Sequence, residues 1–316
     1  MTTNVATIAI IKPGMLTSIQ DLGRWGMQAR GVPVAGPMDE YSHRLANLLV
    51  GNDPSAAALE VTLIGPEMEV LHEVTCAVAG ADFVLRANDT VVPMHEPFVL
   101  RAGSRLRFGE RRRGARATLA FRGGIGVDPV FRSRATSLIA RMGPLDGRAL
   151  RSGDTLPIGG SKMAPHRSRD DATPSRLSVP EGGARVRVLP GPHEDMFTTA
   201  AFETLCHSRF TITPQSNRMG YRLDGPPLAH RRSADVLSDA TAIGSLQVPA
   251  SGLPILLMAD RQTTGGYPKI GTVISADLPL AGQLAPGDWI EFQPCTRDAA
   301  RDAALARFGA LEGLSR

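Results

Sequence analysis

One stretch of the sequence collects side chains that could carry out chemistry. Residues 260–270 read Asp-Arg-Gln-Thr-Thr-Gly-Gly-Tyr-Pro-Lys-Ile, so a carboxylate, a carboxamide, hydroxyls, a phenol and an ammonium surround two glycines. Adjacent glycines let the backbone approach a ligand and present N–H groups to it. Apolar runs at 254–259 and 272–274 flank the stretch and predict a strand, a polar loop and a second strand. A solvated hairpin tip is the alternative, but it does not explain why Tyr and Pro close the loop.

Further loops combine arginine with carboxamide, hydroxyl or carboxylate side chains, at 20–24, 133–136 and 216–222. Guanidinium groups suit carboxylates and phosphates, and carboxamides pair with amide or urea edges. This inventory favours a small polar substrate that is anionic or carries an amide, although each arginine alone is more often part of a surface ion pair. The candidate catalytic residues are Asp260, Lys269 and Arg134, and the candidate substrate-binding residues are Gln20, Asp21, Arg24, Ser133, Arg218, Gln247, Gln262, Thr263 and Thr264.

Other kinds of site are not indicated. The sequence has no nucleophile elbow, Walker loop, HExxH or dinucleotide fingerprint, and its 7 histidines are scattered without ligand spacing, so we expect no metal site. The formal charge of +4 is small for 316 residues. The dense basic cluster 111–113 is interpreted as a solvated hairpin tip, and no nucleic-acid binding is expected.

Composition and periodicity predict a mainly β protein with a few short helices. Glycine (33) and proline (24) are plentiful, and short apolar runs with turn residues between them recur from 59 to 158, which is typical of a barrel or sandwich. Helical spacing predicts helices over 38–50, 195–205 and 297–311, the last with Leu305 and Phe308 facing inward. We expect an N-terminal β domain over 1–160, a linker over 161–184, a C-terminal β domain over 185–295 and a C-terminal helix over 296–316.

A short pattern occurs in both halves of the chain. An apolar anchor, a glycine turn and an alternating strand begin at Leu100, Leu150 and Leu284. The last two close comparable β-rich segments, which suggests two related barrels, although the repeat is too short to prove a duplication.

The cellular setting is indicated by three further features. Cys76, Cys206 and Cys295 lie far apart without metal-type spacing, and we expect buried free thiols in a reducing cytoplasm. The first residues carry no basic region followed by an apolar one, so no signal peptide is indicated. No apolar run approaches the roughly 20 residues of a membrane helix, so no membrane association and a cytoplasmic location are expected.

Several motifs resemble one known family, the biotin-dependent carboxyltransferase or allophanate-hydrolase-subunit-2 family, whose members include 5-oxoprolinase C subunits and KipA. They run in the family's order over nearly the whole chain: Gln20-Asp-Leu-Gly-Arg, Ala46-Asn-Leu-Leu-Val-Gly-Asn, Leu59-Glu-Val-Thr-Leu-Ile-Gly-Pro, Ser216-Asn-Arg-Met-Gly-Tyr-Arg-Leu, Gln247-Val-Pro and residues 260–269. The resemblance implies two cyclophilin-like β-barrel domains. The sequence departs from the family's pattern at 132–136, at His193 and at Asn217.

The resemblance also implies a function. It implies the role of the C subunit of an ATP-dependent 5-oxoprolinase, a hydrolase that opens the cyclic amide 5-oxoproline to L-glutamate. A B-type subunit of the same family and a barrel-type A subunit would be its partners, with ATP and Mg²⁺ used by the complex. Two alternatives stay open: a biotin-dependent carboxyltransferase component acting on urea or a related amide, and a KipA-like, non-enzymatic regulatory binding protein.

The candidate site residues are the polar members of the matched loops, and loops on rigid β scaffolds are where sites collect. We therefore predict that they border one polar cleft between the two barrels. Arg134 and Arg218 are assigned to anion binding, and Asp260 and Lys269 to proton handling or to orienting the arginines.

Overall fold

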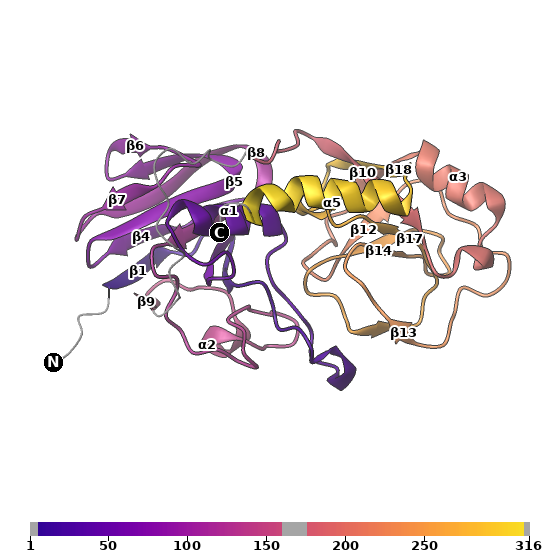
Figure 1. Ribbon diagram of the computed structural model, residues 1–316, viewed down its shortest axis with the longest axis horizontal. Helices are drawn as coiled ribbons and strands as arrows, with labels where there is room; N and C mark the ends of the chain where they lie inside the picture. The colour runs from indigo at the N-terminus through magenta and orange to yellow at the C-terminus, as the bar shows by residue number, and fades with distance from the viewer. Residues whose placement is uncertain (1–5, 160–175, 313–316) are drawn as a thin grey trace. The chain divides into compact units, whose positions relative to one another are not determined.

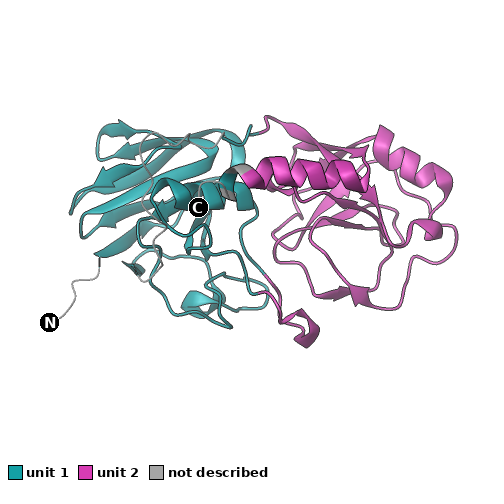
Figure 2. Ribbon diagram, in the orientation of Figure 1, with its two compact units in different colours: residues 1–24, 35–179, 310–316 teal, residues 25–34, 180–309 magenta. Residues whose placement is uncertain are grey.

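The computed structural model describes residues 6–159 and 176–312, and the chain divides into two compact units (Figures 1 and 2). Unit 1 comprises Met1–Arg24, Ala35–Val179 and Ala310–Arg316, and unit 2 comprises Trp25–Val34 and Pro180–Gly309. Most of the predicted linker, residues 161–175, lies outside the described part of the chain. Its last two residues begin strand β10 (Gly183–Pro190).

Unit 1 is built on one curled sheet that forms a half-barrel. Its main path runs β2-β3-β8-β4-β1-β9, and β5 pairs with β8 and also with β6 and β7. Apolar side chains of its strands form a single buried cluster. The strands are β1 (Ala6–Lys12), β2 (Leu16–Gln20), β3 (Ala58–Thr62), β4 (Glu67–Val70), β5 (Val74–Ala87), β6 (Thr90–Val92), β7 (Phe98–Leu100), β8 (Arg105–Phe121) and β9 (Thr155–Ile158).

Two long strands correct the prediction for the basic cluster. β5 and β8 pair along most of their length, and their register shifts at several points between Gly80 and Leu85. Bulges of this kind bend a strand and increase its twist without ending it. Arg111–Arg113 are exposed but lie within β8, where Arg113 is paired with Asp82. The expected hairpin tip at these residues is therefore wrong.

Helix α1 (Glu40–Leu49) packs on β5 and β8. Asp39 caps its N-terminus by accepting hydrogen bonds from the Ser42 backbone N–H (2.9 Å) and hydroxyl (2.6 Å), which satisfies donors that a helix start leaves unpaired. Beyond the helix, Asn52 donates to Asn47 Oδ1 (2.9 Å) and to the carbonyl of Phe121 (2.8 Å). The asparagines of the motif at 46–52 thus tie α1 to the end of β8.

The seven main strands of unit 2 form a closed barrel in the order β10-β17-β14-β15-β12-β11-β18. It closes because β18 pairs with β10 in parallel, so that every one of the seven strands has a neighbour on both sides. A two-stranded sheet of β13 and β16 lies outside this path. The remaining strands are β11 (Arg209–Ile212), β12 (Gly220–Asp224), β13 (Asp239–Ala240), β14 (Ser245–Gln247), β15 (Ile255–Leu257), β16 (Thr264–Gly265), β17 (Lys269–Val273) and β18 (Trp289–Pro294).

The repeated pattern corresponds to three glycine turns, each leading into a strand. Gly103, Gly153 and Gly287 have φ of +79°, +89° and +94° and precede β8, β9 and β18. No atom lies within 4 Å of a Cβ added at any of them. The positive φ alone therefore accounts for glycine at these positions.

The mainly β prediction is confirmed, because the helices are few and mostly short. They are α1, the four-residue α2 (Pro144–Gly147), α3 (Thr199–His207), α4 (Leu278–Gly282) and α5 (Arg297–Glu312), with 3-10 turns η1 (Gln28–Arg30) and η2 (Glu194–Met196). The prediction that Leu305 of α5 faces inward is wrong, because its side chain is 64% exposed. Across the described residues, no helix combines the length and apolar character needed to cross a membrane.

Candidate functional site

The candidate residues of unit 1 form a loop cluster centred on Asp21. Asp21 Oδ1 accepts hydrogen bonds from the Ser133 hydroxyl (2.6 Å) and the Gly23 N–H (2.9 Å), and Oδ2 accepts from the Arg134 N–H (2.5 Å). Ser133 Oγ in turn accepts from the Ala135 N–H (3.0 Å). Both oxygens of the carboxylate therefore hold the 133–135 loop against the end of β2.

The other polar side chains of this cluster also bond to backbone carbonyls. Gln20 donates to the carbonyl of Thr136 (3.0 Å), and the buried Arg24 donates to the carbonyl of Ala135. Arg134 donates through Nε to the carbonyl of Val127 (2.5 Å). The structure thus brings Gln20, Asp21, Arg24, Ser133 and Arg134 together, as a hydrogen-bonded group of loop residues.

In unit 2 the candidate residues lie on and around one side of the barrel, where strands β12, β15 and β14 are neighbours. Arg222 is paired with Ile255, and Ile255 with Gln247, so these three residues form one row across the strands. The alternate residues Tyr221, Leu256 and Leu246 are buried. Because successive side chains of a strand point to opposite faces, the row faces away from the filled barrel interior.

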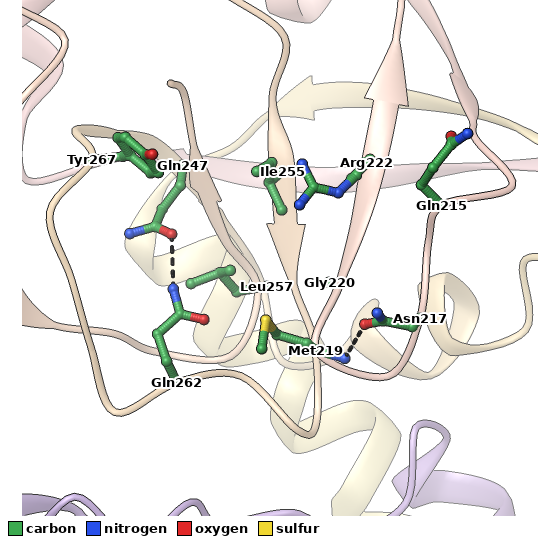
Figure 3. Close-up of a pocket in the computed structure, with 10 residues that line it drawn as sticks. All are labelled: Gln215, Asn217, Met219, Gly220, Arg222, Gln247, Ile255, Leu257, Gln262 and Tyr267. Carbon is green, nitrogen blue, oxygen red and sulfur yellow. Dashed lines mark hydrogen bonds between the residues drawn. The ribbon is translucent and has the colours of Figure 1, made fainter. Parts of the chain in front are cut away.

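A pocket of about 330 Å³ covers this row, within the usual range for small-molecule sites, about 300–1,000 Å³. Its floor is apolar, with Ile255, Leu257 and Met219, and the absent side chain of Gly220 adds space. Figure 3 shows polar side chains around this floor, with Tyr267 from the 260–270 loop at one end. The polar lining residues are Gln215, Asn217, Arg222, Gln247, Gln262 and Tyr267.

Two carboxamides meet at one side of the pocket (Figure 3). Gln262 Nε2 donates to Gln247 Oε1 at 3.2 Å. Gln247 is 1% exposed, and its Nε2 has no hydrogen-bond partner among the described residues. Gly265 makes room for this amide, because a Cβ there would lie 2.4 Å from Gln247 Nε2. A buried amide with an unused donor can bind the polar group of a ligand.

Arg218 and Asp260 form a buried ion pair next to the pocket. Arg218 Nε lies 3.1 Å from Asp260 Oδ2, and Nη2 lies 3.2 Å from Oδ1, while the side chains are only 4% and 0% exposed. The Asp260 N–H also donates to the carbonyl of Arg218 (2.8 Å). The pair joins the polar turn before β12 to the start of the 260–270 loop, and neither residue lines the pocket.

Lys269 is likewise engaged in an ion pair. Its buried Nζ donates to Asp239 Oδ2 and to the carbonyl of Ala240, both at 2.7 Å. The hydrogen bond from Lys269 holds the pKa of Asp239 below its usual value. The Lys269 N–H donates to His193 Nδ1 (3.2 Å). Lys269 thereby anchors strand β13 over the loop.

The structure places two of the predicted site residues of unit 2 in the pocket. Gln247 and Gln262 line it, whereas Arg218, Asp260 and Lys269 are buried in contacts of their own and do not line it. Thr263 accepts from the Thr241 N–H through its carbonyl (3.0 Å), and Thr264 is exposed in β16. A single cleft that includes both units' residues stays a prediction.

Several lining residues were not selected from the sequence. Arg222 belongs to the polar loop region 216–222, and Tyr267 closes the 260–270 loop, but neither was chosen as a site residue. The signal for Arg222 was the alternation Gly-Tyr-Arg-Leu-Asp of β12, which sets Arg222 on the face opposite Tyr221 and Leu223. Across residues 6–159 and 176–312, no group of three His, Cys, Asp or Glu side chains could hold a metal ion.

Comparison with known proteins identifies the family of this chain. Residues 30–294 match the family described as carboxyltransferase domain, subdomain A and B. The chain belongs to the carboxyltransferase family. The motifs at 46–52, 59–66 and 216–223 and the 260–270 loop all lie within the matched range, so the resemblance inferred from them is confirmed.

Three relatives show how similar this chain is in sequence and structure to other members of the carboxyltransferase family. It is 40% identical to the 5-oxoprolinase C subunit of Escherichia coli over 94% of both chains. It is 35% identical to the 5-oxoprolinase C subunit of Haemophilus influenzae over 87% of both chains. The crystal structure of the K. lactis urea amidolyase superposes on 99% of this chain with a TM-score of 0.91 and 30% identity, and this chain spans 20% of that longer one.

Proposed function

We propose that this chain is the C subunit of an ATP-dependent 5-oxoprolinase, which opens 5-oxoproline to L-glutamate together with A and B subunits. The observation that carries the proposal is the 40% identity to the 5-oxoprolinase C subunit of Escherichia coli over 94% of both chains. Such coverage leaves no large part of either chain unmatched.

The pocket of unit 2 supports this substrate class. 5-Oxoproline is a five-membered lactam with a carboxylate, so it presents an amide edge, an anion and ring methylenes. The pocket offers two carboxamides, one guanidinium and an apolar floor, which are the complementary groups. Its lining residues would bind and orient the lactam, and an apolar floor would exclude water from the ring face.

The rest of the reaction requires the partners. A barrel-type A subunit and a B-type subunit of the same family would assemble with this chain in the cytoplasm, and the complex would hydrolyse ATP with Mg²⁺. The described residues contain no cluster that could hold a metal ion. The pocket of unit 2 supports substrate binding and orientation as the role of this chain.

Reconstitution of the complex tests the proposal. The three purified subunits should release L-glutamate from 5-oxoproline and hydrolyse ATP in a 5-oxoproline-dependent manner, and the mixture without this chain should do neither. If all three subunits are folded and assembled and 5-oxoproline stimulates no ATP hydrolysis, the proposed function is wrong.

A second candidate is a biotin-dependent carboxyltransferase component acting on urea or a related amide. It is favoured by the TM-score of 0.91 with the K. lactis urea amidolyase. Biotin and a biotin carboxylase would then be supplied by partners. Transfer of labelled CO₂ from carboxybiotin to urea by the purified chain would support this candidate, whereas transfer no faster than without the chain would exclude it.

A further inference from the structure

We propose that Arg222 is the carboxylate-binding residue of the unit 2 pocket, and that it makes the pocket prefer cyclic amides that carry a carboxylate over those that do not. The inference rests on the proposed function and deepens it, because it names the residue that recognises the anionic group of the substrate. With this proposal Arg222 replaces Arg134 and Arg218, which we had predicted from the sequence to bind the anion.

Among the arginines considered for anion binding, Arg222 has the most available guanidinium. Arg218 donates through Nε and Nη2 to Asp260, and Arg134 uses Nε on a backbone carbonyl. The Arg222 side chain makes no hydrogen bond or ion pair with any described residue. It is also the one charged side chain among the ten that line the pocket.

The backbone of Arg222 is held in place. β11 pairs with β12 only at Asp224 and Leu223, so the edge of β12 beyond these residues needs other partners. The Arg222 N–H donates to the Ser216 hydroxyl (3.0 Å), and the Arg222 carbonyl accepts from the Thr213 N–H (3.0 Å). The Arg222 side chain can therefore move at the pocket wall while its backbone is held in place.

The pocket separates an anion-binding side from an amide-binding side. Arg222 and Gln247 are two strands apart in one row, with Ile255 between them, which corresponds to about 10 Å between strands. In Figure 3 the Arg222 guanidinium points across β15 toward the side that carries Gln247 and Gln262. Side chains reaching inward from both ends leave room for a small ring above Ile255 and Leu257.

The two carboxamides fit the lactam end of such a ligand. Their mutual hydrogen bond uses Gln262 Nε2 and Gln247 Oε1 and leaves Gln262 Oε1 without a partner within the described residues. In Figure 3 this oxygen is turned toward Leu257. It can accept the lactam N–H, while the carboxylate, which the ring carbon next to that nitrogen carries on the side away from the lactam carbonyl, pairs with Arg222.

The test compares two substrates and two variants in the reconstituted complex. Arg222→Gln should raise the KM for 5-oxoproline by about 10- to 100-fold, the range that loss of a hydrogen bond to a charged group gives. It should not change the KM for 2-pyrrolidinone, which has the lactam but no carboxylate. Arg222→Lys should restore part of the affinity for 5-oxoproline.

Arg232→Gln is the matched control, because Arg232 is an exposed arginine of unit 2 that does not line the pocket. It should leave both KM values unchanged. An Arg222→Gln complex with the wild-type KM for 5-oxoproline overturns the inference and leaves the proposed function intact. Equal losses for 5-oxoproline and 2-pyrrolidinone also overturn it, since they would indicate a structural role.

Direct binding separates the two proposals. If the complex does not turn over 5-oxoproline, calorimetric titration of the full-length chain with 5-oxoproline still tests Arg222. Binding by the wild type that is lost in Arg222→Gln and kept in Arg232→Gln supports the residue assignment without the enzymatic role. No binding by the wild type, or equal binding by the Arg222→Gln variant, overturns the inference.

Discussion

Two ion pairs of unit 2 show how burial changes the contribution of an ion pair to the stability of the fold. Arg218 and Asp260 are almost fully buried, whereas Arg301 and Asp298 of α5 are 67% and 85% exposed and 3.8 Å apart. Exposed pairs contribute little because water screens them. Removing one partner of a buried pair leaves the other charge without compensation.

We therefore expect Asp260→Asn to lower the free energy of unfolding by on the order of 3 kcal/mol. Asp298→Asn should leave the unfolding temperature unchanged, and thermal unfolding of both variants and the wild type measures the difference. Equal unfolding temperatures for all three proteins would show that the buried pair does not stabilise the fold.

The two adjacent glycines of the 260–270 loop should respond differently to a methyl group. A Cβ at Gly265 would lie 2.4 Å from Gln247 Nε2, whereas at Gly266 the nearest atom is 3.5 Å away. Because the atom in the way is the end of a side chain, Gly265→Ala should displace the Gln247 amide with little loss of stability. Its KM for 5-oxoproline should rise, while Gly266→Ala should keep the wild-type KM. The reverse order would contradict the assignment of Gln247 to the pocket.

At the scale of single elements, the turn before β18 offers a test of backbone preference alone. Gly287 has φ of +94°, and no atom would contact an added Cβ. Gly287→Ala should cost about 1 kcal/mol from the left-handed backbone, and Gly287→Asn should cost less because asparagine tolerates this region. Unfolding temperatures would rank wild type, Asn and Ala in that order. An alanine variant as stable as the wild type would contradict the turn geometry.

The elements also show how far the sequence could predict the structure. Alternating or continuous apolar runs predicted most strands, including β15 and β17 on either side of the 260–270 loop, because burial is encoded locally. The continuation of β8 through Arg111–Arg113 was missed because its pairing with β5 is a long-range contact.

The same limit applies to the site. Arg218 and Arg222 look alike in the sequence, and only the fold shows that Asp260, 42 residues away, engages the first and leaves the second at a pocket. Gln247 and Gln262 could be selected because their motifs resemble a family. Their contact with each other required the barrel.

At the scale of the whole chain, stability should depend on pH through His43. Burial lowers the pKa of His43 to about 4, with Asp21 opposing this and Arg44 adding to it. In an unfolded chain a histidine has a pKa of about 6.5. Between these values the unfolded state binds a proton that the folded state does not, so the free energy of unfolding falls as the pH is lowered from about 6.5 to about 4. Above and below this window the contribution is constant.

His43→Gln should therefore show a weaker fall in unfolding temperature over this window than the wild type. His207 is an exposed histidine of α3, and His207→Gln should keep the wild-type pH profile. Thermal unfolding at closely spaced pH values measures all three. If His43→Gln follows the wild-type profile over the whole window, His43 is not a cause of the pH dependence.

The pocket lies on the outer wall of a barrel whose interior is filled by other side chains of the same strands. Along β12, residues that pack in the barrel interior therefore alternate with residues that face the pocket. A substitution in one of these two sets need not disturb the other set. Substitutions at Arg222 or in the covering loops could change ligand preference while Tyr221 and Leu223 keep the core. Divergence of this kind would let one scaffold serve both the 5-oxoprolinase subunits and the urea amidolyase to which this chain is similar. Insertion of a single residue in β12 would have the opposite effect, because it would exchange the two sets of side chains at once.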